Sequence, residues 1–154
     1  MNRIHLQQTL PEVFADRQSV ASDVWHQDLT FRKGERYLIE AASGTGKSSL
    51  CSYLYGSRND YQGIITFDET NIKAYSVSQW TQLRKGSLSM LFQDLRLFSE
   101  LTAWENVQLK NNLTGHKKKK EIAALFEQLG IAEKKDTPTG RLSFGQQQRV
   151  AFIR

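Results

Sequence analysis

The apolar residues fall into short runs of strand length and longer stretches with helical spacing. The runs of strand length, one of them followed by the turn residues Lys33-Gly34-Glu35, predict β-strands. They are Leu29–Phe31, Tyr37–Ile39, Gly63–Phe67 and Leu88–Gln93. Residues 1 to about 40 are, as a whole, typical of a hairpin-rich segment.

Helices are predicted by periodicity and by their end signals. Apolar residues at i, i+3, i+4 and i+7 indicate one amphipathic helix that ends at Gly130; they are Ile122, Leu125, Phe126 and Leu129. Capping boxes, in which Glu or Gln follows three residues after Ser or Thr, predict two more helix starts. These boxes join Thr102 to Glu105 and Ser143 to Gln146. Residues 78–84 predict a short helix.

The stretch from Glu40 to Ser49 carries most of a phosphate-binding P-loop, between an apolar run and an apolar helical stretch. Its glycines let successive N–H groups point at phosphate oxygens, its lysine adds positive charge, and its serine can hold Mg²⁺. The helix that begins there adds a favourable dipole. The expected nucleotide-binding residues are Ser43, Gly44, Thr45, Gly46, Lys47, Ser48 and Ser49, with Ser48 also binding the metal. The alternative is a Gly/Ser turn with a chance Lys-Ser pair.

Ala41 and Cys51 lie at the start of this loop and just after it. Ala41 stands where the usual pattern begins with glycine, and a Cβ is acceptable there only if its φ is negative. Cys51, the only cysteine, lies on the following helix and is predicted to be a buried, inert thiol.

Strands alternate with helices around the loop, which favours a three-layer α/β fold with a mostly parallel sheet.

A second motif runs from Leu142 to Val150. The predicted helix start exposes free N–H groups beside Ser143 and Gly145, a second place where an anion could bind. Together with the P-loop, Leu142-Ser-Phe-Gly-Gln146 followed by Gln-Gln-Arg-Val closely resembles the signature motif of ATP-binding cassette (ABC) ATPases, Leu-Ser-Gly-Gly-Gln. The sequence departs from that motif at Phe144, where the family usually has glycine.

The resemblance covers nearly the whole chain and adds detail about fold and partners. It implies one nucleotide-binding domain over residues 1–154, with an antiparallel β region and a helical subdomain at about 94–142. It also implies ATP and Mg²⁺ as cofactors and a head-to-tail dimer. In that dimer, Ser143, Gly145 and Gln146 of one subunit would close over ATP held by the P-loop of the other.

By the same resemblance, Gln93 lies in the family's Q-loop, where it would contact Mg²⁺ or the attacking water. The loop after Gln93 would face a membrane-spanning transporter subunit. Considered alone, a Gln after a strand is an ordinary surface residue. Phe14 lies where the family places an aromatic residue that stacks on adenine, although a core position accounts for it equally well. The motifs Phe92–Phe98 and Leu101–Val107 resemble the group that serves lipoprotein release, macrolide-type efflux and cell division.

Composition agrees with a globular chain of one domain. Hydrophobic residues make up 39% and charged residues 24%, which is near the ordinary range. No apolar run is long enough to span a membrane, and the N-terminus lacks the apolar core of a signal peptide. We therefore expect a cytoplasmic location and, from the resemblance, a peripheral position on the inner face of the cytoplasmic membrane.

The formal net charge of +5 raises the question of nucleic acid as a partner. The sharpest cluster, Lys117 to Lys120, opens the amphipathic helix described above. A solvated helix face explains these lysines better than a nucleic-acid patch does, so we consider nucleic acid an unlikely partner.

Arg154 falls within the helix that begins at Ser143, and no cap follows it. In the family, the Walker B strand, its glutamate and a switch histidine all come after the signature helix; His5, His26 and His116 all precede it. We therefore expect an incomplete ABC subunit, truncated before the Walker B strand and inactive alone, because phosphoryl transfer needs an acidic residue for Mg²⁺ and a group that positions water.

The leading hypothesis is the ATP-binding, ATP-hydrolysing subunit of an ABC transporter. Lys47 and Gln93, with Ser143 and Gly145 acting in trans, are its expected catalytic residues. The alternatives are a regulatory module that binds nucleotide without hydrolysing it, and a soluble ABC ATPase that acts on nucleic acid.

Overall fold

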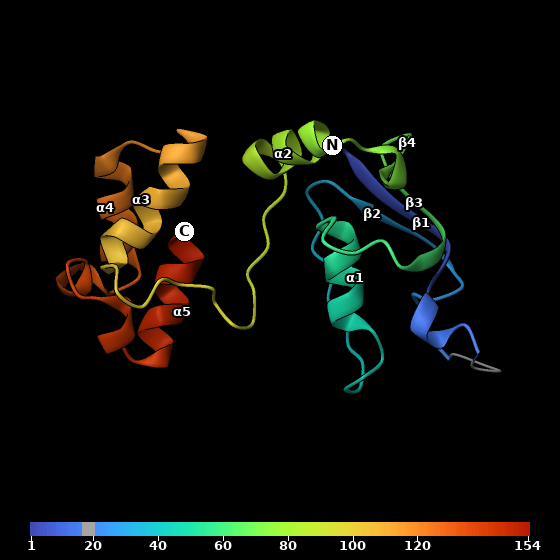
Figure 1. The fold of residues 1–154 in the computed structure, drawn as a ribbon, viewed down its shortest axis with the longest axis horizontal. Coiled ribbons are helices and arrows are strands. Elements are labelled where there is room, and N and C mark those ends of the chain that lie inside the picture. The colour runs from blue at the N-terminus through green and yellow to red at the C-terminus, as the bar shows by residue number, and fades with distance from the viewer. Residues whose placement is uncertain (17–20) are drawn as a thin grey trace. The chain divides into compact units, whose positions relative to one another are not determined.

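The computed structural model describes residues 1–16 and 21–154. They form two compact units, Met1–Ser89 and Met90–Arg154, whose elements are labelled in Figure 1. Each unit has its own hydrophobic core.

The first unit contains an antiparallel sheet whose strands lie in the order β2-β1-β3-β4. The strands are β1 (Arg3–Pro11), β2 (Asp28–Arg32), β3 (Tyr61–Phe67) and β4 (Thr70–Asn71). Leu6 on β1 is paired with Leu29 on one side and with Ile65 on the other. Residues that are paired directly across neighbouring strands lie on the same face of the sheet, and these three side chains pack in the core. The strands expected at 29–31 and 63–67 and the antiparallel β region are confirmed.

Two helices accompany this sheet, α1 (Lys47–Leu54) and α2 (Val77–Gly86), with 3₁₀ turns at Glu12–Phe14 and Ile72–Ala74. Helix α1 places Leu50 and Tyr53 in the core of the sheet. Cys51 is exposed, so the expectation of a buried thiol is wrong; the helix turns its neighbours toward the sheet instead. The helix expected at 78–84 is confirmed as α2, which begins with a capping box between Ser76 and Gln79.

The sheet differs from the expected one in the direction of its strands. The α/β class is confirmed, but every pairing among the described residues is antiparallel, and neither 37–39 nor 88–93 forms a strand. A strand of a parallel sheet needs ladder bonds from its neighbours and helices over both faces. In the described residues these two segments have no ladder partner, and the side chain of Leu38 is 83% exposed.

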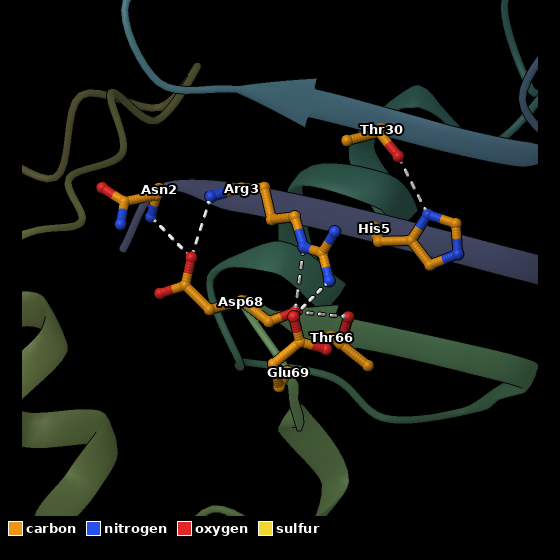
Figure 2. Close-up of polar contacts among 7 residues, drawn as sticks. All are labelled: Asn2, Arg3, His5, Thr30, Thr66, Asp68 and Glu69. Carbon is orange, nitrogen blue, oxygen red and sulfur yellow. Dashed lines mark hydrogen bonds and ion pairs between the residues drawn. The ribbon is translucent and has the colours of Figure 1, made fainter.

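Polar side chains bond across the sheet and at one end of it (Figure 2). His5 Nδ1 lies 3.0 Å from the Thr30 hydroxyl across the β1–β2 pair. At the end of β3, the Asp68 carboxylate accepts hydrogen bonds from the backbone N–H groups of Asn2 (2.7 Å) and Arg3 (3.0 Å). These two bonds hold the pKa of Asp68 below its ordinary value. The turn after β3 thus fixes the start of β1.

The second unit is helical. Its helices are α3 (Ala103–Thr114), α4 (Lys119–Gln128) and α5 (Phe144–Ile153), with 3₁₀ turns at Ala132–Lys134 and Thr139–Arg141. Val107, Phe126 and Val150, one from each helix, lie in its core. The predicted capping boxes at Thr102 and Ser143 are both present. Across the described residues, no helix is both long enough and apolar enough to cross a membrane.

Candidate phosphate-binding site

The P-loop curves from the end of the extended segment at Ile39 into α1. Gly44 and Gly46 have φ values of +77° and +97°, a region that L-residues with side chains rarely adopt. Gly46 is the N-cap of α1, and the first helical bond runs from the Leu50 N–H to the Gly46 carbonyl. The N–H groups of the first helical turn are therefore not used by the helix itself. Together with the helix dipole, they make this end of α1 suited to a phosphate group.

Lys47 folds back over the loop in this structure. Its ammonium donates hydrogen bonds to the carbonyls of Ala41 and Ala42, the second at 2.8 Å. The Thr45 hydroxyl also donates to the Ala42 carbonyl, at 2.8 Å. The ammonium that is expected to meet phosphate is therefore bonded to neutral carbonyl oxygens. A phosphate oxygen could take their place and would be a stronger, charge-assisted acceptor.

The departure at the start of the motif causes no strain. Ala41 is not among the described residues with positive φ. The condition set by the sequence, a negative φ at this position, is therefore met. The Ala41 carbonyl contributes to the loop by accepting a bond from Lys47.

Two aromatic rings support the loop from the core side. Trp25 and Phe14, each 4% exposed, lie against Gly46, where an added Cβ would come within 3.0 Å of Trp25 and 3.1 Å of Phe14. Trp25 also donates its indole N–H to the Thr45 carbonyl, at 2.9 Å. Both rings line a cavity of about 640 Å³ that reaches Thr45 and Lys47. The sequence reasoning missed Trp25 altogether, since no motif marks it.

The two serines after Lys47 differ in their surroundings. Ser48, the expected metal ligand, is exposed, whereas the Ser49 hydroxyl accepts a hydrogen bond from Arg58 at 3.2 Å. Arg58 also pairs with Asp60, and this contact lowers the pKa of the Asp60 carboxyl and raises that of the guanidinium. Of these two serines, Ser48 is therefore the more open one, as a metal ligand would require.

Gln93 belongs to the second unit, where it is exposed in a turn. It follows no strand, contrary to expectation, because residues 88–92 are not paired with any described segment. Two residues of the segment after it, Leu95 and Arg96, adopt left-handed backbone conformations, with φ values of +54° and +49°. Leu95 is buried, and Arg96 pairs with Asp94 at 3.3 Å.

The segment after Gln93 is anchored by Asn106, a fully buried residue of α3. Its side-chain carbonyl accepts from the Phe98 N–H at 2.9 Å, and its amide donates to the carbonyls of Phe98 and Leu101 at 3.0 and 3.2 Å. The Thr139 hydroxyl also donates to the Phe98 carbonyl, at 2.7 Å. Sequence reasoning placed Asn106 on a helix but did not foresee this role, because its partners depend on the path of the preceding loop.

The signature residues sit at the start of α5. The Ser143 hydroxyl accepts from the Gln146 N–H at 3.4 Å, and the Gln146 side chain accepts from the Ser143 N–H at 3.0 Å. Nothing lies within 4 Å of a Cβ added at Gly145, and Phe144 is 62% exposed. This end of α5 is therefore open to an incoming group. Phe14 and residues 43–49 come together in the first unit, while Gln93, Ser143, Gly145 and Gln146 belong to the second.

Comparisons with known proteins agree on one family. A family model described as ABC transporter matches residues 25–154. The lipoprotein-releasing system ATP-binding protein LolD of Legionella pneumophila is 34% identical over 158 residues, which cover 100% of this chain and 70% of LolD. The methionine import ATP-binding protein MetN 1 of Enterococcus faecalis is 31% identical over 144 residues, which cover 92% of this chain. The chain spans only 40% of the length of that methionine import protein.

Solved structures show the same fold. The structure of cbiO1 from Clostridium perfringens, part of the ABC transporter complex cbiONQ, has a TM-score of 0.69 and 27% identity. It covers 99% of this chain, which matches 61% of cbiO1. The dimeric bacterial ABC transporter cassette MJ0796 has a TM-score of 0.78 and 24% identity, covering 97% of this chain and 67% of that one.

Proposed function

Because this chain belongs to the ABC transporter family, whose ATPases bind ATP, usually with Mg²⁺, we propose that it binds ATP at Ser43–Ser49 as the ATP-hydrolysing subunit of a transporter. The observation that carries the proposal is the loop itself. Its two glycines adopt left-handed conformations, its lysine lies over it, and it ends at the start of α1. This combination fits a phosphate chain better than any other ligand class.

The loop residues would have different roles in binding ATP. Lys47 would leave the carbonyls of Ala41 and Ala42 and neutralise the charge of the β- and γ-phosphates. The Ser48 hydroxyl, which is exposed beside the loop, would hold Mg²⁺ together with phosphate oxygens. The described residues contain no group of three or more His, Cys, Asp or Glu side chains that could hold a metal. A hydroxyl oxygen and phosphate oxygens are hard oxygen ligands, the class that Mg²⁺ prefers.

For Phe14, packing favours the core alternative over stacking on adenine. Only 4% of the residue is exposed, and its ring lies beneath Gly46. Little of the ring is therefore open to a base. We assign Phe14 to the support of the loop rather than to the recognition of adenine.

The proposal includes partners. Ser143, Gly145 and Gln146 would bind the γ-phosphate of ATP held by a second ATPase subunit, in a head-to-tail dimer. The open start of α5 supports this arrangement, because Ser143 and Gly145 are exposed and nothing lies within 4 Å of a Cβ added at Gly145. The exposed segment after Gln93 would meet a membrane-spanning subunit, which would hold the protein at the inner face of the cytoplasmic membrane.

The proposal is tested by ATP binding to the Lys47→Ala variant, measured by calorimetry in the presence of Mg²⁺. Loss of the ammonium should weaken binding at least about tenfold, because a hydrogen bond to a charged group contributes roughly 1.5–3 kcal/mol. The exposed Lys85 on α2 provides the matched control: Lys85→Ala should bind ATP as the unaltered chain does. Equal ATP affinity in the Lys47→Ala and Lys85→Ala variants would refute the proposed site.

A further inference from the structure

Trp25 lies outside the P-loop in the sequence but is bonded to it in the fold. Its indole N–H donates to the Thr45 carbonyl at 2.9 Å, across a separation of 20 residues. The ring is 4% exposed and lies against Gly46, where an added Cβ would come within 3.0 Å of it. One side chain therefore touches both residues of a single peptide unit of the loop.

The direction of that peptide unit matters for phosphate. In a trans peptide the C=O and N–H bonds point in opposite directions, and no peptide bond among the described residues is cis. Because the Thr45 carbonyl points at Trp25 on the core side, the Gly46 N–H points away from the core. If the unit turned over, it would present a carbonyl oxygen to an anionic ligand instead of an N–H group.

The flanking residues alone do not fix this direction. The Thr45–Gly46 unit would turn over by rotation about ψ of Thr45 and φ of Gly46. Gly46 has a positive φ and no side chain, and glycine moves between such backbone regions at little cost. The indole has one donor and no acceptor, so it can pair with the carbonyl but not with the N–H. The part-buried Thr45 carbonyl, if it lost this partner, would carry the cost of an unmade hydrogen bond.

We propose that Trp25 is a positioning residue of the phosphate-binding loop. Its indole N–H holds the Thr45–Gly46 peptide in the orientation that offers the Gly46 N–H to the phosphates. The inference rests on the proposed function, since it assigns a role within the same ATP site. Without the indole N–H, only part of the population would hold the binding-competent peptide, and the apparent ATP affinity would fall by that fraction.

The sharpest test replaces one atom. In a Trp80→Phe/Trp104→Phe background, Trp25 is the only tryptophan left of the three. It can then be exchanged during expression for the isostere in which sulfur replaces the indole N–H. Trp80 packs on Phe67 and Tyr75, and Trp104 packs on Phe126, so neither ring is part of the loop's support.

Calorimetry with ATP and Mg²⁺ should show about fivefold weaker binding with the isostere, the typical effect of one hydrogen bond. Thermal unfolding is followed on the same samples, and the affinity is corrected for any unfolded fraction. Trp25→Phe, which keeps a ring but has no donor, should lose affinity to at least the same extent. Trp80→Phe alone should bind ATP as the unaltered chain does.

The outcomes separate the two proposals. If the unaltered chain does not bind ATP, the proposed function fails. If it binds ATP and the isostere binds equally well, the function stands and the positioning role of Trp25 is refuted. A loss confined to Trp25→Phe, or one that disappears after correction for unfolding, would show that the ring's volume matters rather than its hydrogen bond, and would also overturn the inference.

Discussion

Gly46 joins the P-loop to α1 and is packed closely against two aromatic rings. Its φ is +97°, and a Cβ would meet the rings of Trp25 and Phe14 at 3.0 and 3.1 Å. Gly46→Ala should therefore lower the free energy of unfolding by about 3 kcal/mol, through backbone strain and overpacking combined. It should also weaken ATP binding, because the loop must shift. Chemical denaturation and calorimetry measure the two effects.

Gly86 provides the matched control for that substitution. It ends α2, has no positive φ, and nothing lies within 4 Å of its added Cβ. Gly86→Ala should be neutral or stabilising by up to about 1 kcal/mol, because alanine restricts the unfolded chain. If both variants were equally stable, crowding at Gly46 would be ruled out as a cause.

Asp68 makes stability depend on pH. The N–H groups of Asn2 and Arg3 lower the pKa of its carboxyl in the folded state from an ordinary 3.8 (Figure 2). A lowered folded pKa stabilises the fold above the unfolded value, and this contribution is lost as pH falls through the folded pKa. Asp68→Asn should therefore destabilise the first unit near neutral pH and flatten its loss of stability in acid. Unfolding midpoints between neutral pH and about pH 2 measure this difference; parallel profiles would contradict it.

For single residues, the sequence predicts the positions that the P-loop motif specifies. It misses side chains that come to the loop from elsewhere in the chain. The condition on Ala41 followed from stereochemistry alone and is confirmed. The Trp25–Thr45 bond had no sequence signal, because its partners are 20 residues apart and meet only in the folded chain. The roles of Lys47 and Ser48 toward ATP stay predictions.

Among the elements, α3 depends on a polar residue where an apolar one would be expected. Asn106 is fully buried and makes hydrogen bonds to both the N–H and the C=O of Phe98. Asn106→Ala should cost about 3 kcal/mol, because it leaves several buried backbone groups without partners. Urea denaturation measures the loss, and faster hydrogen exchange at the Phe98 amide would locate it in the segment after Gln93.

Asn112, an exposed asparagine on the same helix, is the control for this variant. Asn112→Ala should change stability by no more than about 0.5 kcal/mol, as surface substitutions generally do. Equal effects of the Asn112 and Asn106 variants would mean that the loss reflects helix propensity rather than the buried hydrogen bonds.

The helices were predictable because their signals are local. The capping boxes at Thr102 and Ser143 involve partners three residues apart, and both form as expected. The run Tyr37–Ile39 looks the same in the sequence whether or not neighbouring strands pair with it. Its state therefore depends on distant segments, which explains why the apolar run predicted a strand that the described residues do not form.

For the whole molecule, the decisive property is that the two expected phosphate sites lie in different compact units. The P-loop belongs to Met1–Ser89 and the start of α5 to Met90–Arg154. A head-to-tail dimer would use one site from each of two chains. The proposal therefore predicts that ATP itself causes association, which sedimentation velocity can measure with and without ATP.

Ser143→Arg separates binding from association. A long, charged side chain at the N-cap of α5 should block the partner's γ-phosphate and prevent ATP-dependent dimers, yet leave ATP binding at the P-loop intact. Ser78→Arg, at an exposed position on α2, should still dimerise. Because a dimer of Ser143→Arg with Lys47→Ala keeps one complete site, mixing the two variants should restore a fraction of the ATP-dependent dimer that neither forms alone. Dimers of Ser143→Arg alone, as abundant as those of the unaltered chain, would mean that α5 does not close over ATP in trans.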